Sequence, residues 1–85
     1  MFKVQLDAQP TKFLRKADRI LLKRLGKKID SLKKDPVPHD AKRILNRKEL
    51  VFRVRVGEYR IIYVVYHKEN NVFIFKIEKR SRAYS

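Results

Sequence analysis

The chain has 85 residues, of which 44% are apolar, and its 23 Lys and Arg against 9 Asp and Glu give a formal net charge of +14. A chain of this length builds one modest core, so we expect a single domain over residues 1–85, and the absence of cysteine excludes disulfides, a thiolate nucleophile and a zinc–cysteine site. Solubility needs a charge of only about 2 to 8 on a small domain, so the excess predicts a polyanionic partner: RNA, DNA or an acidic protein.

Nothing in the sequence predicts a membrane location. The longest apolar runs, residues 61–66 and 72–75, are too short to span a bilayer. The N-terminus lacks the basic segment followed by an apolar stretch that marks a signal peptide, and the lack of cysteine fits a reducing compartment. We therefore expect a cytoplasmic protein with no membrane partner.

The first segment predicts a strand and a short helix. Residues 2–6 alternate in polarity, which places one set of side chains on an inward face: Phe2, Val4 and Leu6. Asp7 can accept hydrogen bonds from free backbone N–H groups at a helix start, and Pro10 is tolerated in a first turn. The helix is expected over about residues 8–16.

A second helix follows, with Asp18 as its predicted N-cap. Its apolar residues recur at intervals of four, four and three, which aligns them on one face toward a sheet: Leu21, Leu25, Ile29 and Leu32. Asp35 precedes Pro36, and a residue before proline is pushed out of the helical region, so the helix ends there. We interpret the segment from there to Arg47 as a basic loop.

A tight hairpin is predicted at Gly57-Glu58. A two-residue loop with glycine first selects a primed turn, which puts Arg55 directly opposite Arg60. Arg53 shares their face because side chains alternate along a strand. A solvated sheet surface is the simpler interpretation, but like charges facing each other across a strand pair are destabilising. This pairing favours an anionic ligand, with phosphate as the first candidate.

A second hairpin is predicted through Glu69-Asn70-Asn71, with its last residue in the left-handed conformation. This three-residue loop keeps apolar partners on the core face, with Tyr63 opposite Ile77. A two-residue loop would turn Arg80 toward the core, where an unpaired charge is costly. The favoured register therefore predicts a row of arginines on three adjacent strands: Arg55, Arg60 and Arg80.

Together these elements predict an α+β fold, a four-stranded, mainly antiparallel sheet packed on a two-helix hairpin in the order β-α-α-β-β-β. The aromatic residues of the later strands are assigned to the helix-covered face as packing residues: Phe52, Tyr63, Phe73 and Phe75. The two histidines, His39 and His67, have no further histidine or carboxylate at ligand spacing. We therefore expect neither a metal site nor a cofactor.

A resemblance to a known family rests on three stretches: Phe52-Arg53-Val54-Arg55-Val56, Glu58-Tyr59-Arg60-Ile61-Ile62-Tyr63 and Lys79-Arg80-Ser81-Arg82-Ala83-Tyr84. With the predicted element order, they resemble the RelE branch of the RelE/ParE toxin superfamily over essentially the whole chain. The resemblance implies a ribosome-dependent endoribonuclease that cuts messenger RNA in the ribosomal A site. It also implies an acidic, RelB-like antitoxin that wraps and neutralises the toxin.

The resemblance further implies roles for single residues. Arg53 and Arg55 occupy two basic positions that are commonly lysine in bacterial RelE, and Arg60 matches the arginine of a Tyr-Arg dipeptide. Arg80 matches a late active-site arginine, for which Arg82 competes. The terminal aromatic that stacks on a base and joins the proton chemistry is Tyr84. Additional substrate contacts are expected from three cations: Lys48, Lys79 and Arg82.

The chemistry can be argued from residue types alone. RNA carries its own nucleophile, the 2′-OH, so a protein that fixes an in-line geometry and neutralises the phosphorane accelerates cleavage without a metal. A guanidinium donates two parallel hydrogen bonds to phosphate oxygens. Arginine keeps its proton, so Arg53 and Arg55 cannot act as a general base, and residue types alone show no evident base. The resemblance gives Tyr84 a part in the proton chemistry, which it can perform if neighbouring guanidinium groups favour its phenolate. With so weak a base, we expect the nuclease to depend on the ribosome to orient the message.

Two other classes of function stay open. A ParE-like relative would poison gyrase instead of cutting RNA. A catalytically silent module that binds RNA or the ribosome is compatible with arginine at positions 53 and 55. Truncation of Tyr84 separates the first alternative from the nuclease, because a gyrase poison should remain toxic without it.

Overall fold

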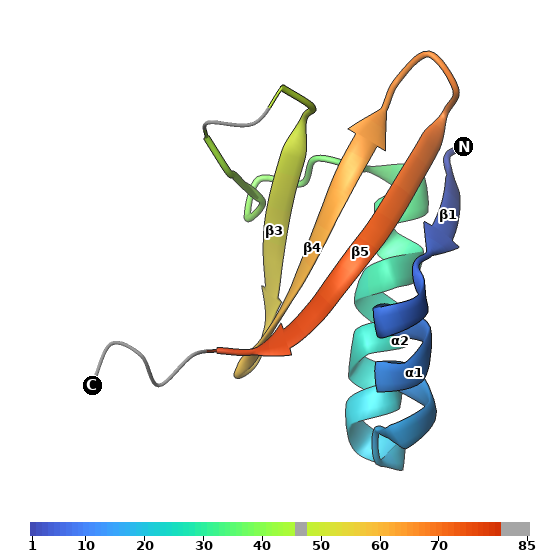
Figure 1. Cartoon of the computed structure of the whole chain (residues 1–85), viewed down its shortest axis with the longest axis vertical. Coiled ribbons are helices and arrows are strands. Elements are labelled where there is room, and N and C mark those ends of the chain that lie inside the picture. Colours follow the sequence, from blue (N-terminus) through green and yellow to red (C-terminus); the bar gives the residue numbers. More distant parts are fainter. Residues whose placement is uncertain (46–47, 81–85) are drawn as a thin grey trace.

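The computed structural model describes residues 1–45 and 48–80. Two helices cover one face of a five-stranded sheet, and Figure 1 shows them side by side next to β1 and β5. The strand order in the sheet is β1-β5-β4-β3-β2. In chain order the elements are β1 (Lys3–Leu6), α1 (Ala8–Lys16), α2 (Arg19–Lys34), β2 (Lys42–Arg43), β3 (Val51–Val56), β4 (Tyr59–Tyr66) and β5 (Asn71–Lys79).

The α+β class and the two-helix hairpin are confirmed, whereas the predicted four-stranded sheet is wrong. Lys42 and Arg43, inside the predicted basic loop, form the edge strand β2, which pairs with Arg53 and Phe52 of β3. A strand of two residues is too short for its alternation to be visible in a sequence. The sheet is mixed because β1 runs parallel to β5, while the other pairs are antiparallel.

Both helices begin and end where the sequence predicts. The Asp7 carboxylate accepts a 2.8 Å hydrogen bond from the backbone N–H of Ala8, and Asp18 accepts one of 2.8 Å from Leu21. These bonds satisfy donors that a helix start leaves without intrahelical partners. α2 ends at Lys34, before Asp35 and the proline that follows it.

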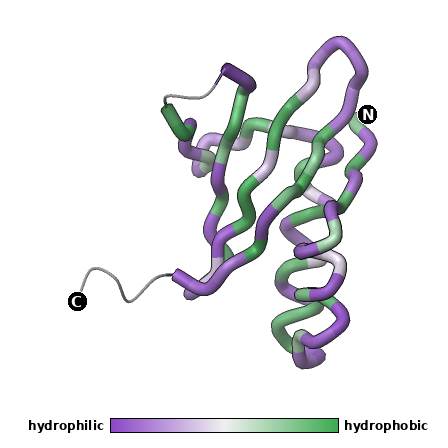
Figure 2. Tube along the Cα trace, in the orientation of Figure 1, coloured by the Kyte–Doolittle hydropathy of each residue, from purple (hydrophilic) through white to green (hydrophobic). Residues whose placement is uncertain are grey.

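The core lies between α2 and the helix-covered face of the sheet. Its buried residues come from α2 and from three strands: Leu25, Ile29, Leu32, Phe52, Val54, Ile61, Tyr63, Val65, Val72, Ile74 and Ile77. Figure 2 shows hydrophobic residues along the middle of β4 and hydrophilic residues around the β3–β4 turn and the end of β5. Phe2, just before β1, and Val4 in β1 pack against this core as predicted, but Leu6 is 38% exposed.

Tyr63 anchors the loop after α2 to this core. Its ring is fully buried, and its hydroxyl donates a 2.7 Å hydrogen bond to the carbonyl oxygen of Pro36. Burial raises the pKa of Tyr63, and the nearby charges of Asp40 and Asp35 raise it further. Tyr63 is therefore a neutral packing residue, as the sequence predicts.

The predicted register of the second hairpin is wrong. Asn70, with φ 50°, takes the left-handed conformation that was assigned to Asn71, and Asn71 instead pairs with Tyr66. The ladder then shifts between Ile62 and Tyr63, where β5 carries one extra residue. The shift places Glu78 opposite Arg60, at the position predicted for Arg80.

The same register moves two aromatic residues off the core face. Phe73 lies opposite Val64, and both Phe73 and Phe75 are half-buried outside the core cluster. Phe52 and Tyr63 are on the core side as predicted, with ring centroids 6.0 Å apart. No helix within the described residues is long and apolar enough to cross a membrane.

Candidate functional site

The first hairpin has the predicted geometry. Gly57 has φ +61°, the left-handed conformation that glycine adopts at no steric cost, and Arg55 lies directly opposite Arg60 across the β3–β4 ladder. Arg55 is exposed and Arg60 half-buried. The face-to-face pair of arginines is therefore confirmed.

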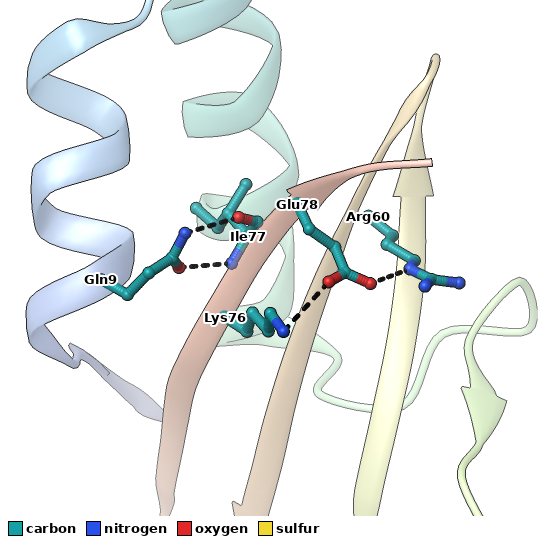
Figure 3. Close-up of polar contacts among 5 residues, drawn as sticks. All are labelled: Gln9, Arg60, Lys76, Ile77 and Glu78. Atoms are coloured by element: carbon teal, nitrogen blue, oxygen red, sulfur yellow. Dashed lines mark hydrogen bonds and ion pairs between the residues drawn. The ribbon is translucent and has the colours of Figure 1, made fainter. Parts of the chain in front are cut away.

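The structure adds a carboxylate next to this pair. Arg60 donates a hydrogen bond from Nε to Oε2 of Glu78, its neighbour on β5, as Figure 3 shows. The Nζ of Lys76 lies 3.3 Å from the other oxygen, Oε1. Glu78 thus binds two cations at once and orients the guanidinium of Arg60.

The pKa of Glu78 reflects opposing influences. Partial burial raises the pKa of the carboxyl, but hydrogen bonds from Arg60 and Lys76, together with their positive charges, lower it by more. The net pKa lies below its usual value of 4.5. Glu78 is consequently ionised at neutral pH.

A second group of cations lies at the β2–β3 edge. Lys42 pairs with Arg53 across the two strands, and a shallow depression of about 170 Å³ is lined by four residues: Asp40, Lys42, Arg53 and Arg55. Asp40 is engaged elsewhere, because its Oδ2 accepts a 2.7 Å hydrogen bond from Lys28. This bond lowers the pKa of Asp40 more than its slight burial raises it.

Two other predicted site residues, Arg80 and Lys79, lie beside the β3–β4 turn, whereas Lys48 lies at the opposite end of β3 and is not brought to the site. Arg80 is exposed just past β5, and its backbone N–H donates to the carbonyl oxygen of Glu58. Lys79 also approaches Glu58, with 3.9 Å between Nζ and Oε2, while Lys48 is exposed in the loop between β2 and β3. The roles assigned to Arg82 and Tyr84 fall on positions outside the described residues.

Gln9 of α1 fixes the free edge of β5 beside this site. Its Nε2 donates to the carbonyl oxygen of Ile77 at 2.8 Å, and its Oε1 accepts from the N–H of Ile77 at 2.9 Å (Figure 3). β1 pairs with β5 only as far as Leu6 and Ile74, so the Gln9 side chain takes the place of a further strand residue. Glu78 follows directly after the residue that Gln9 holds.

Sequence reasoning missed the contributions of Gln9 and Lys42 and the contact of Glu78 with Arg60. The spacing that relates Gln9 to Ile77 is set by the helix–sheet packing, for which the chain carries no local signal. The arrangement as a whole offers several guanidinium groups and a lysine to a polyanion. In residues 1–45 and 48–80 there is no group of three or more His, Asp or Glu that could hold a metal ion.

Comparison with known proteins agrees with the fold. Residues 5–84 match the family described as ParE toxin of type II toxin–antitoxin system, parDE. A curated protein of Methanocaldococcus jannaschii, named as a candidate RelE1 toxin, is 35% identical over 98% of this chain and 94% of its own length.

Solved structures are similar over nearly the whole chain. The archaeal RelE–RelB complex from Pyrococcus horikoshii OT3 gives a TM-score of 0.85 at 28% identity, covering 95% of this chain and 97% of that one. The isolated E. coli RelE toxin gives 0.81 at 22% identity, covering 99% and 92%. The chain therefore belongs to the RelE/ParE family and is the toxin of a RelBE-type toxin–antitoxin system.

Proposed function

We propose that this toxin is a ribosome-dependent endoribonuclease that cleaves messenger RNA in the ribosomal A site. The observation that carries the proposal is the pair Arg55 and Arg60, which face each other on the sheet face that the helices leave open. Arg53 and Lys42 extend the positive surface along β3 and β2. A scissile phosphate bound between these groups would offset the mutual repulsion of the arginines.

The reaction needs no nucleophile from the protein. The RNA 2′-oxygen forms a bond to the adjacent phosphorus while the bond to the 5′-oxygen of the next nucleotide breaks. The negative charge that develops on the phosphorane is stabilised by donors already positioned to meet it, which is the role we assign to Arg55 and Arg60. Glu78 accepts a hydrogen bond from Nε of Arg60 and so orients this guanidinium on the sheet face.

The 2′-OH must lose a proton and the leaving oxygen must gain one. Arg53 and Arg55 stay protonated, and both carboxylate oxygens of Glu78 are bound by cations. We assign the proton transfer to Tyr84, with Arg80 as the further guanidinium at the end of β5 and Arg82 as the competitor for that role. The base is weak, so the ribosome supplies the in-line orientation of the message.

We further propose an acidic, RelB-like antitoxin as the partner that holds the toxin inactive. Solved relatives from Pyrococcus horikoshii and E. coli are described as complexes of RelE with RelB. A chain with charge +14 binds an acidic partner strongly, and a ligand specific for the folded state raises its melting temperature. Co-expression with the product of the neighbouring gene should yield a stable complex that melts higher and does not cut RNA.

Primer-extension mapping after induction of the toxin tests the proposed activity directly. Discrete cuts inside translated codons support it, whereas DNA damage without cuts would indicate a gyrase poison. Growth arrest with neither change would indicate a binding module without catalysis. A strain that expresses Arg60→Ala serves as the matched control, because its toxin should leave the same messages intact.

A further inference from the structure

A second basic groove lies on the helix side of the β3 edge. It has a volume of about 540 Å³ and is lined by residues of α2 and of the β3–β4 hairpin: Arg24, Lys27, Lys28, Ser31, Arg55, Val56 and Gly57. The four α2 residues are three or four positions apart and so share one face of the helix. Within the part of the chain that the structure describes, no carboxylate lines the groove.

Arg24 is held at the turn of the hairpin. A Cβ atom added to Gly57 would lie 2.7 Å from Nη2 of Arg24, so the glycine leaves the space that this guanidinium occupies. Lys28 is neutralised by Asp40 at 2.7 Å. Among the described residues, no ion pair involves Arg24, Lys27 or Arg55. Three cations therefore converge on the groove without an acidic partner.

The strand edge adds a neutral donor. The carbonyl of Leu50 accepts from Val65 of β4, whereas the carbonyl of Val51 accepts from Ile44 on the opposite side. Backbone groups alternate in direction along a strand, so the N–H of Arg55 is directed to the same side as Val51. β2 ends its pairing at Arg53, which leaves that edge open at Arg55.

Arg55 links the two depressions. It lines both this groove and the smaller one formed with Lys42 and Arg53 on the open face. Cations are thus arranged in a track from α2, over the strand edge, to the proposed cleavage site. An acidic helix would need apolar anchors between its charges, and the groove offers only Val56, so spaced phosphates fit it better.

We propose that Arg24, Lys27 and Arg55 form a phosphate-binding groove that holds the backbone of an RNA strand next to the cleavage site. The choice of RNA as ligand rests on the proposed function. The contacts are to phosphate only, so they set the position of the strand and carry no preference for sequence.

The test compares Arg24→Gln/Lys27→Gln with a control of equal charge on the same helix, Lys23→Gln/Lys34→Gln, whose residues lie outside the groove. The probe is a fluorescent 2′-O-methyl oligoribonucleotide, which lacks the nucleophile and cannot be cut. Loss of two phosphate contacts should weaken binding about tenfold at low salt and reduce the log–log salt slope by about 1.4. The control should change affinity less than about threefold, because its two lysines act on the RNA only through the long-range electrostatic field of the protein, which salt screens.

Two further probes, vacant ribosomes and polyglutamate, decide the outcome. The groove variant is tested separately on vacant ribosomes and on the oligonucleotide. A loss of affinity for ribosomes assigns the groove to ribosomal RNA, and a loss of affinity for the oligonucleotide assigns it to the message; either result supports the groove. Equal effects of the groove pair and the control pair on both probes would overturn it. The proposal would also be overturned if the groove variant lost affinity for polyglutamate but for neither of the other two probes, because that result indicates an acidic protein ligand.

Failure of the groove and failure of the nuclease are distinguishable. If the wild-type toxin cuts no message while the groove variant still loses RNA affinity, the groove stands and the cleavage proposal fails. If the wild type cuts and the groove variant binds both probes normally, the groove is wrong and the cleavage proposal stands.

Discussion

Arg60 on β4 is paired with Glu78 on β5, and this contact sets the character of the basic surface. The carboxylate lies where the sequence predicts a third arginine, so an internal anion offsets part of the repulsion between Arg55 and Arg60. Arg53 and Arg55 have no ion pair within the described residues. An external anion is therefore expected to bind mainly to the arginines of β3, Arg53 and Arg55.

The Glu78 contact should make stability depend on pH. The pKa of Glu78 is lowered in the folded state, so its contribution is complete above the usual value of 4.5 and is lost as pH falls through the lowered pKa. Urea unfolding of wild type and Glu78→Gln should give a constant difference from pH 6 to 8 that shrinks below about pH 4.5. A difference that grows on acidification would contradict the assignment.

Alanine at the two facing arginines should separate catalysis from stability. Arg55→Ala and Arg60→Ala should each reduce ribosome-dependent cleavage by about ten- to a hundredfold, because each removes a donor to the phosphate. Only Arg60→Ala should also cost stability, by about 1 kcal/mol, since it leaves Glu78 with Lys76 as its single cation. Single-turnover cleavage and thermal unfolding measure both effects, and wild-type cleavage by Arg60→Ala would refute the site.

Gln9→Ala should loosen the end of β5. It removes the partners of both backbone groups of Ile77, which are partly buried, at a cost of about 1–3 kcal/mol. Gln5→Ala is the matched control, because Gln5 accepts only an exposed 3.1 Å bond from the side chain of Asn71. Hydrogen exchange at the Ile77 amide should accelerate in the first variant and not in the second. Equal exchange in both would show that the clamp contributes nothing.

Replacing each of the two glycines with alanine should change the stability of the protein in opposite directions. Gly57 has φ +61°, so Gly57→Ala strains the turn and should destabilise the protein by about 1 kcal/mol or more. Gly26 is helical with no atom within 4 Å of a built Cβ, so Gly26→Ala should stabilise it by about 0.5–1 kcal/mol. Each change corresponds to roughly 4–8 °C in melting temperature per kcal/mol for a domain of this size. Shifts of the same sign would be inconsistent with this assignment.

The parts of the fold that depend on residues close together in the chain could be predicted from the sequence. The caps Asp7 and Asp18 and the turn at Gly57 act over a few positions, and each is where local rules place it. The β4–β5 register could not be derived in the same way. It depends on an extra residue in β5, a bulge between the pairs Ile62–Lys76 and Tyr63–Ile74 that no local rule places.

The same division applies to the candidate site. The pairing of Arg55 with Arg60 follows from a two-residue turn and was predicted correctly. Placing Glu78 beside Arg60 required the bulge, and the contact of Gln9 with Ile77 spans 68 positions of the chain. Side chains that meet through tertiary packing leave no spacing in the sequence by which to find them.

Cleavage of one message by the purified toxin, free in solution and on a programmed ribosome, tests the central claim most directly. The account predicts cuts within the A-site codon on the ribosome, at least a hundredfold slower cleavage of the free message, and loss of the ribosomal cuts in Arg60→Ala. Binding of the free message should nevertheless be measurable and should weaken as salt rises. Equally fast cleavage of free and ribosome-bound message, or ribosomal cuts that survive Arg60→Ala, would contradict it.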